Sequence, residues 1–143
     1  MHIDIHDEID RKALEAMEAA MAIIFEGGLN RAQADALLGV LQTGFNGITT
    51  AKLDYGSLLT ELSVSVAGTP DWQCVFSRVY RSPAGTLHRL VISNCTLKFA
   101  QIGEKSPSDY ELEFAVPSEA FRMANHKHNE LLKAGYRIGR RQS

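Results

Sequence analysis

The chain has 143 residues, a formal net charge of −2 and a hydrophobic fraction of 45%. This length favours a single domain over residues 1–143, and the composition lies well outside the range of disordered chains. No apolar run approaches the roughly 18 residues of a membrane-spanning helix, and no basic leader precedes the first apolar helix. We therefore expect a cytoplasmic protein without a signal peptide and without membrane association.

The first part of the chain, residues 1–47, is predicted to be a helical hairpin. Apolar residues recur at helical spacing up to Gly27–Gly28, which permit the left-handed backbone that ends a helix. Asn30 and Gln33 resemble a capping box at the start of a second helix, which Gly47 ends. Because the link between the two helices is so short, they should pack antiparallel.

Two glycines inside the second helix, Gly39 and Gly44, each weaken an exposed helix by about 1 kcal/mol relative to alanine. We expect another backbone to pack closely at these positions. Further along, residues 52–59 read as a short helical turn whose inward-facing side chains are those of Leu53, Tyr55 and Leu58.

Residues 58–116 are predicted to form an antiparallel sheet. A first strand covers residues 62–66, and four more lie between Trp72 and Val116. In the second strand, apolar side chains recur at every other position, so they share one face, and Arg78 is the only interruption. Proline and glycine in residues 81–85 indicate a hairpin turn. The remaining strands, residues 87–93, 95–102 and 110–116, follow on short links and should pair antiparallel.

Residues 118–134 are predicted to form a third helix, with Ser118 as its N-cap and Gly135 as its C-terminal cap. A basic tail, residues 136–143, could begin with an edge strand. The residues expected on the inner side of the helix are Phe121, Ala124, His128, Leu131 and Leu132. Those expected mostly on the outer side are Arg122, Asn125, Lys127, Glu130 and Lys133. The predicted fold is therefore α+β: a helical hairpin, a four- to six-stranded mainly antiparallel sheet, and a C-terminal helix.

Charge is distributed unevenly, because residues 1–26 carry a net −5 and residues 122–143 a net +5. The basic segment could contact phosphates or an acidic protein surface. Its candidate binding residues are Arg122, Lys127, Lys133, Arg137, Arg140 and Arg141. Since the whole chain is acidic, its long-range field does not favour nucleic acid, and we expect a protein partner instead. A second copy of the chain, through its acidic first helix, is one such partner.

An alternative hypothesis is a small-ligand site on the aromatic face of the sheet. Its candidate ligand-binding residues are Trp72, Arg78, Tyr80, Arg89 and Tyr110. Arg78 or Arg89 would hold an anionic or nucleotide-like ligand against the aromatic rings. The competing interpretation, which we prefer for Arg78, places this residue near the edge of the sheet with its guanidinium in water.

Metal and catalytic chemistry receive little support from the residue patterns. His2, Asp4 and His6 lack a distant partner ligand, and His126 and His128 point in different directions on a helix. Glu111 and Glu113 are better explained as a solvated strand edge than as an acid–base pair. We expect no metal, no cofactor and no catalytic residue.

The two cysteines, Cys74 and Cys95, both fall in strand patterns. We interpret them as buried, reduced thiols; a disulfide between neighbouring strands is the alternative, and a nucleophilic pair with His88 is a further one. No stretch matches the motif of a known family residue by residue. The resulting hypothesis is a non-enzymatic binding or assembly protein that homo-oligomerises, such as a small regulator, an inhibitor or a phage-type accessory protein.

Overall fold

The computed structural model describes residues 5–66 and 72–139; of Ile5–Asp7, residues 65–66 and residues 72–75 it describes the backbone only. The chain divides into two compact units, Met1–Cys74 and Val75–Ser143. Helices and antiparallel strands are segregated along the chain, so the fold belongs to the α+β class, as predicted. In the described part of the chain, no helix combines the length and the apolar character needed to cross a bilayer.

The first unit is built on a helical hairpin. Helix α1 (Ile5–Glu26) packs against α2 (Arg31–Asn46), and these are followed by α3 (Thr49–Tyr55), the 3₁₀ helix η1 (Gly56–Glu61) and strand β1 (Ser63–Val66). The predicted capping box is confirmed: the Asn30 side chain accepts from the Gln33 amide at 2.8 Å, and the Gln33 side chain accepts from the Asn30 amide at 3.0 Å.

The two glycines of α2 have different surroundings. A Cβ atom added at Gly44 would lie 2.6 Å from Met17 Cε on α1, so the close neighbour at this glycine is a side chain. The expectation that another backbone packs closely is wrong at both positions, because at Gly39 no neighbouring atom lies within 4 Å of the added Cβ. Only one of the two positions therefore offsets the weaker helix propensity of glycine with tight helix packing.

The predicted helical turn at residues 52–59 is two helices that meet at Gly56, whose φ of +47° ends α3. Tyr55 and Leu58 are fully buried as expected, and the Tyr55 ring packs on Phe45 with centroids 4.7 Å apart. The inward orientation predicted for Leu53 is wrong, because its side chain is 72% exposed. Leu53 and Tyr55 both lie in α3, where side chains two positions apart point about 200° apart, so the two side chains cannot both face inward.

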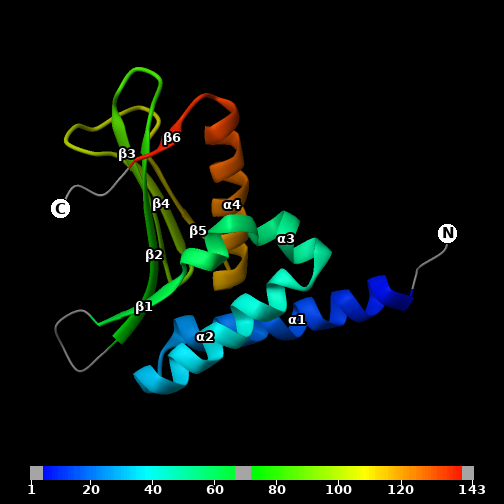
Figure 1. The fold of residues 1–143 in the computed structure, drawn as a ribbon. Coiled ribbons are helices and arrows are strands. Elements are labelled where there is room, and N and C mark those ends of the chain that lie inside the picture. Colours follow the sequence, from blue (N-terminus) through cyan, green and yellow to red (C-terminus); the bar gives the residue numbers. More distant parts are fainter. Residues whose placement is uncertain (1–4, 67–71, 140–143) are drawn as a thin grey trace. The chain divides into compact units, whose positions relative to one another are not determined.

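The second unit is a five-stranded antiparallel sheet with one helix against it. Its strands are β2 (Trp72–Arg81), β3 (Leu87–Ser93), β4 (Thr96–Gln101), β5 (Tyr110–Glu113) and β6 (Arg137–Ile138), and their order in the sheet is β6-β2-β3-β4-β5. The four strands predicted between Trp72 and Val116 and the short terminal strand are thus confirmed. Helix α4 (Pro117–Lys133) runs along one face of this sheet (Figure 1).

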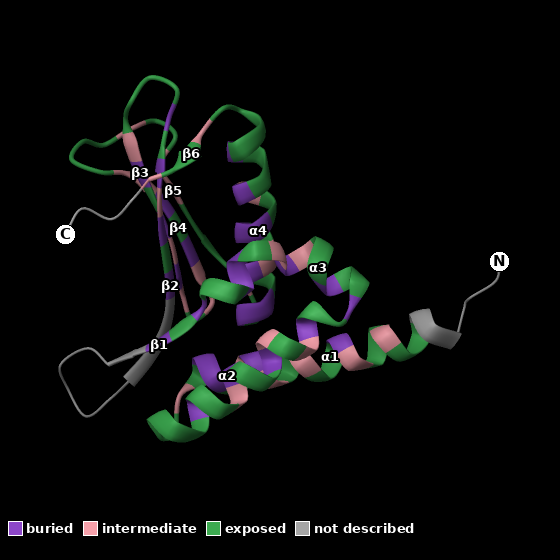
Figure 2. Cartoon of the chain, in the orientation of Figure 1, coloured by how far each residue is buried: buried purple, intermediate pink, exposed green. Residues whose placement is uncertain are grey.

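Alternation along the strands separates an inner face, which α4 covers, from an outer face. The inner positions of β2, β3 and β4 are buried, as the purple segments of Figure 2 show. Phe76 on β2 meets Phe121 on α4 edge to face, with centroids 5.6 Å apart. The buried apolar side chains of this core are Phe76, Leu90, Ile92, Leu97, Phe99, Ala120, Phe121, Ala124 and Leu131.

Turn chemistry fixes the register of the hairpins. Gly85 adopts φ +91° in the β2–β3 turn, and Asn94 adopts φ +54° in the turn that joins β3 to β4. The register then pairs Tyr80 with His88 and Ser93 with Thr96. The predicted turn at residues 81–85 and the turn at Asn94 both contain a residue that tolerates a positive φ.

The ends of α4 differ in how well the sequence predicted them. Ser118 is not the N-cap: Val116 occupies that position without a side-chain cap, Pro117 follows, and Ser118 is buried inside the first turn. At the other end, the Gly135 amide donates to the Leu132 carbonyl and the Tyr136 amide to the Leu131 carbonyl, with Gly135 at φ +94°. This is a Schellman motif, so the predicted glycine terminator is confirmed.

Two side chains of α4 lie on faces other than those predicted. Asn125 is only 2% exposed although an outer position was expected, and Leu132 is 43% exposed although an inner one was expected. β5 ends at Glu113, and its Leu112 is 41% exposed. β5 is an edge strand and pairs only with β4 in the described sheet, so its apolar side chains are covered on one side only.

Candidate functional site

A buried polar cluster joins the inner face of β2 to α4. Arg78 is 5% exposed, and its Nη1 lies 3.1 Å from Nδ1 of His128, which is 4% exposed. The Tyr80 hydroxyl lies 2.7 Å from the same Nδ1 atom. The preferred interpretation of Arg78, with its guanidinium in water at the sheet edge, is therefore wrong.

The chemistry of this cluster fixes the state of His128. A guanidinium can only donate hydrogen bonds, so Nδ1 must accept in its contact with Arg78, and the Tyr80 hydroxyl shares the single lone pair of this nitrogen. His128 is then neutral, with its proton on Nε2. A buried guanidinium is tolerated only when its donors are hydrogen-bonded, and this requirement accounts for the polar residues facing Arg78. The cluster holds α4 on the sheet. Arg78 and Tyr80, two of the candidate ligand-binding residues, use their polar groups for contacts within the protein.

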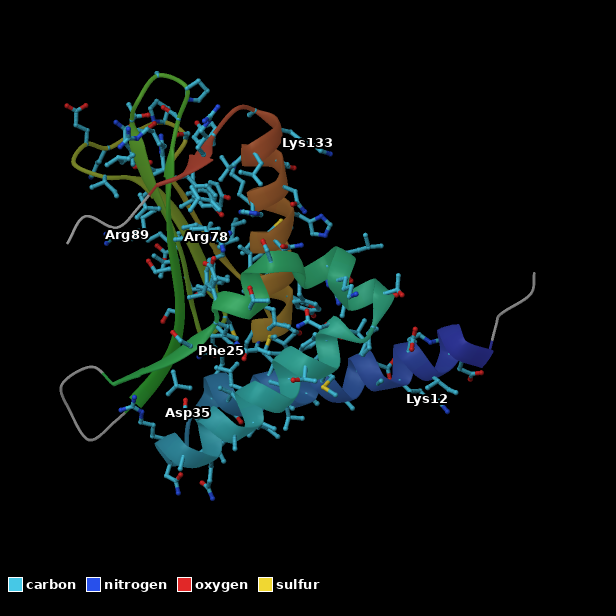
Figure 3. The ribbon with its side chains drawn as sticks, viewed as in Figure 1. Lys12, Phe25, Asp35, Arg78, Arg89 and Lys133 are labelled. Carbon is cyan, nitrogen blue, oxygen red and sulfur yellow. The ribbon has the colours of Figure 1, made fainter. Side chains whose placement is uncertain are left out.

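The candidate ligand-binding residues are distributed over both faces of the sheet. Figure 3 shows Arg78 on the α4 side of the strands and Arg89 on the opposite side, where Arg89 is exposed. Tyr110 is half-buried on the inner face, and burial, with a contribution from Glu130, raises its pKa to about 12. The side chain of Trp72 lies outside the described residues.

The candidate basic residues of the C-terminal segment do not share one surface. Lys127 is half-buried, with its Nζ 5.1 Å from the Phe99 ring centroid and 5.3 Å from that of Tyr110. Arg122 is also half-buried. Lys133 and Arg137 are exposed, on α4 and β6 respectively. Arg140 and Arg141 lie outside the described residues.

The described histidine and cysteine side chains do not converge on one site. On α4, His126 is exposed whereas His128 is buried. In the described residues, no three potential metal-ligating side chains form a group; His2 and Asp4, and the side chain of His6, lie outside them. Cys95 is a free thiol in the β3–β4 turn, at the other end of β3 from His88. Its predicted burial is wrong, because it is half-exposed; the side chain of Cys74 lies outside the described residues.

His88 belongs to a hydroxyl network that stabilises the β2–β3 hairpin. Its Nε2 lies 3.0 Å from Thr86 Oγ1, which is 2.6 Å from Ser82 Oγ. The Thr86 amide also donates to Ser82 Oγ at 3.0 Å. The imidazole is 3% exposed and stacks on Phe99 with an interplanar angle of 4°. These contacts make His88 a packed residue at the base of a turn, which sequence reasoning did not identify.

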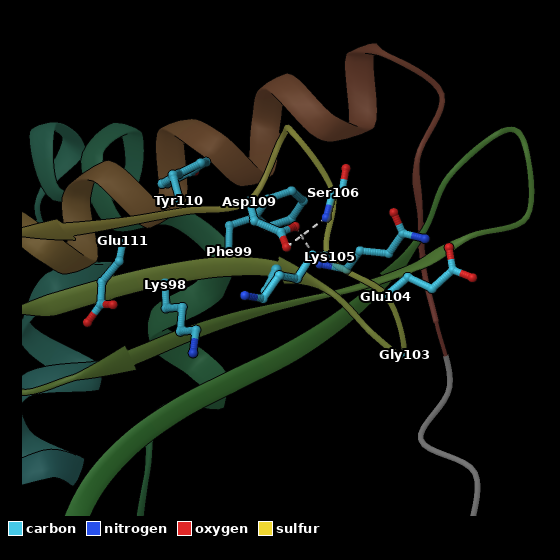
Figure 4. A pocket seen from close by; sticks show the side chains of 11 residues that line it. Lys98, Phe99, Gly103, Glu104, Lys105, Ser106, Asp109, Tyr110 and Glu111 are labelled. Carbon is cyan, nitrogen blue, oxygen red and sulfur yellow. Dashed lines mark hydrogen bonds between the residues drawn. The ribbon is translucent and has the colours of Figure 1, made fainter.

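A cavity of about 570 Å³ opens beside the loop between β4 and β5 (Figure 4). Its most constrained group is the Asp109 carboxylate, which accepts from the Gln101 amide at 2.8 Å and the Ser106 amide at 3.0 Å. These two backbone hydrogen bonds hold the pKa of Asp109 below its usual range. The Asp109 carboxylate therefore stabilises the β4–β5 loop, because its hydrogen bonds link both ends of that loop. The other charged lining residues are Lys98, Glu104, Lys105 and Glu111, whose opposite signs give the cavity no single charge preference.

The two edges of the sheet carry opposite charges on the outer face. At one edge, Arg137 on β6 lies directly opposite Arg81 on β2. At the other edge, Glu111 on β5 lies opposite Lys98, and Glu113 lies opposite Thr96. All four of these edge side chains are exposed, namely those of Arg81, Arg137, Glu111 and Glu113. One edge is thus basic and the other acidic on the same side of the sheet.

Comparison of the chain with protein-family models, with curated proteins and with solved structures gives no match. Inferences about function must therefore come from the chemistry of the described residues.

Proposed function

We propose that this chain is a non-enzymatic assembly protein whose copies associate edge to edge through the sheet of the second unit. The observation that carries the proposal is the opposite charge of the two edges: Arg137 on β6 and Glu111 on β5 project from the same outer face. An edge strand presents unpaired backbone groups that can pair with another chain. Opposite charges at the two edges would select one edge as the partner of the other.

Strand directions support a head-to-tail contact. Because the β6–β2, β2–β3, β3–β4 and β4–β5 pairings are all antiparallel, β5 and β6 both run opposite to β2 and β4 and are therefore parallel to each other. A second copy in the same orientation would place its β6 beside β5, with Arg137 near Glu111 and Ile138 near Leu112. The last two side chains are 51% and 41% exposed, so the contact would also cover apolar surface on the inner side.

Contacts between two identical edges are disfavoured by charge. Pairing of β5 with a second β5 would gather Glu111 and Glu113 from both copies on one face, and like charges opposite each other in a sheet destabilise the pair. Pairing of β6 with a second β6 would bring together two copies of Arg137. A heterologous contact remains, and such contacts form rings or open filaments according to the rotation between copies.

The competing explanation is that Glu111 and Glu113 only keep sheet edges apart, which charged edge residues do in many proteins. A charge-swap experiment separates the two explanations. Under the assembly proposal, Glu111→Lys alone and Arg137→Glu alone each place like charges at the contact and abolish association. An equimolar mixture of the two variants restores complementary charges at both contacts, because each edge of one variant then meets an oppositely charged edge of the other.

Sedimentation velocity at tens of micromolar protein and low ionic strength measures this outcome. Self-association of the unaltered chain should weaken as salt increases, since exposed charge pairs are screened. Glu104→Lys, an equal charge change in the β4–β5 loop, is the matched control and should associate like the unaltered chain. A monomer at every concentration, or a mixture no larger than its separate variants, would contradict the proposal.

Within this proposal, the protein acts in the cytoplasm, where the half-exposed thiol of Cys95 remains reduced. The chain would then serve as a small regulator, an inhibitor or a phage-type accessory protein. Proteins of each kind could act through such an assembly, or could bind a strand of a partner protein at the β5 edge. Capture of an extended peptide by β5 would then follow the same backbone pairing.

A further inference from the structure

Four basic side chains form a diagonal stripe across the outer face of the sheet. Arg137 lies directly opposite Arg81, and Arg89 and Lys98 follow on β3 and β4. All four are exposed. The sequence separates the four residues by up to 56 positions, and only the strand register brings them onto one line. The stripe is thus a product of the tertiary structure.

The register also sets the spacing of the stripe. Arg81 pairs with Leu87 and Val79 pairs with Arg89, so Arg89 is the diagonal neighbour of Arg81. In the same way, Arg89 pairs with Ala100, which makes Lys98 the diagonal neighbour of Arg89. Directly opposite residues lie about 5 Å apart and diagonal ones about 7–8 Å apart. The four cations therefore follow one another across the sheet, first at about 5 Å and then at two diagonal steps of about 7–8 Å.

These cations repel one another in the isolated chain. Like charges directly opposite in a sheet are destabilising, and Arg81 and Arg137 are such a pair. In the described part of the chain, no acidic side chain lies within salt-bridge distance of Arg81, Arg89 or Arg137. An external anion would relieve this repulsion, and a guanidinium fork matches a phosphate group well.

We infer that this stripe binds a linear chain of phosphates, either the backbone of a single-stranded nucleic acid or inorganic polyphosphate. The described side chains between the cations are small or aliphatic, namely those of Val79, Val91 and Ala100. Proteins that bind single strands through their bases supply aromatic stacking platforms, and the described outer positions offer none. The contact would accordingly be made to phosphates and be independent of base sequence.

The charge of the second unit is compatible with such a ligand. Val75–Ser143 contains eleven lysines and arginines against six acidic residues, a net +5, whereas Met1–Cys74 contains four against eleven, a net −7. The whole-chain value of −2 conceals this division. The objection that an acidic chain repels polyanions thus weakens for the unit that carries the stripe.

Fluorescence anisotropy with two labelled probes tests the inference: an oligothymidylate of about 20 nucleotides, long enough to span such a surface, and inorganic polyphosphate. The full chain is used at low ionic strength and at a concentration below any self-association. We expect the doubly substituted Arg81→Gln/Arg89→Gln chain to lose most of the binding. Its salt dependence should flatten by about one unit of log–log slope per lost phosphate contact.

Lys12→Gln/Lys52→Gln, which removes the same charge from exposed positions of the first unit, is the matched control and should bind like the unaltered chain. Equal losses in the two double variants would overturn the inference, as would no binding of either probe. Equally tight binding of polyglutamate would assign the stripe to acidic peptides and overturn the phosphate assignment. Arg81 and Arg89 are not on the edge strands, so failure here leaves the sedimentation test of assembly unaffected.

Discussion

Arg78 and His128 lie fifty residues apart in the sequence and meet in the buried interior of the second unit, with Nη1 and Nδ1 separated by 3.1 Å. The contact links the second strand of the sheet to the helix that covers it. Because the guanidinium is charged and buried, the free-energy cost of burying it depends on the hydrogen-bond acceptors that surround it. The imidazole is thus a structural component of the helix–sheet interface.

Loss of this acceptor should be among the most damaging single changes in the chain. We expect His128→Leu to lower the free energy of unfolding by about 1–3 kcal/mol, because it removes a hydrogen-bond acceptor from a buried guanidinium. Arg78→Met should cost less, since His128 keeps the Tyr80 hydroxyl as a donor. Urea denaturation measures both. His126→Leu, at an exposed position of α4, is the control, and equal losses in all three variants would refute this account of the cluster.

The two glycines of α2 should respond differently to alanine. Gly39→Ala should stabilise the first unit by about 0.5–1 kcal/mol, because the added methyl meets no atom and improves helix propensity. Gly44→Ala should stabilise less or destabilise, since its Cβ would collide with Met17 Cε and force that side chain to move. Thermal unfolding of both variants checks the order. A larger gain for Gly44→Ala would show that Met17 relaxes freely.

Asp109 should contribute a dependence of stability on acid pH. The amides of Ser106 and Gln101 stabilise its carboxylate, so its pKa is lower in the folded than in the unfolded chain. Its contribution is therefore present above the unfolded value of about 3.9 and is lost as pH falls through the folded value. Comparing urea denaturation of the unaltered chain and Asp109→Asn across this range isolates the effect. Identical pH profiles would mean that the carboxylate does not stabilise the loop.

Tyr110 should act at the alkaline end of the pH range. Its pKa is raised to about 12, first by burial and then by Glu130, so the folded chain holds this proton more tightly than the unfolded chain. The resulting stability is complete below the unfolded value of about 10 and is lost as pH rises toward the folded value. Absorbance of tyrosinate, compared between the unaltered chain and Tyr110→Phe, assigns the transition. A Tyr110 transition near pH 10 would contradict the burial argument.

Predictions that depended on local chemistry were the most successful. The capping box at Asn30, the glycine terminator at Gly135 and the hairpin turn at residues 81–85 each involve residues a few positions apart, so the sequence contains both partners. The strand alternation that predicted the inner face of β2 is local in the same sense. It correctly placed Phe76 and Tyr80 inside.

Predictions about polar residues failed where the partner was distant. Arg78 was expected in water because nothing near it in the sequence could satisfy a buried guanidinium, and His128 supplies that acceptor from another element. Asn125 was assigned to the wrong environment because helical spacing does not reveal how far a neighbouring element will cover a helix. The basic stripe was not foreseen, because strand register aligns residues whose spacing in the sequence has no pattern.

The amino-acid sequence by itself determined the order and type of the elements, their turns and the α+β class, because these follow from periodicity and from conformational preferences within a few residues. The tertiary structure alone decided which charges are buried, which edges of the sheet stay open and which cations share a face. Those properties depend on contacts between segments far apart along the chain, and burial and electrostatic free energies are set by such neighbours.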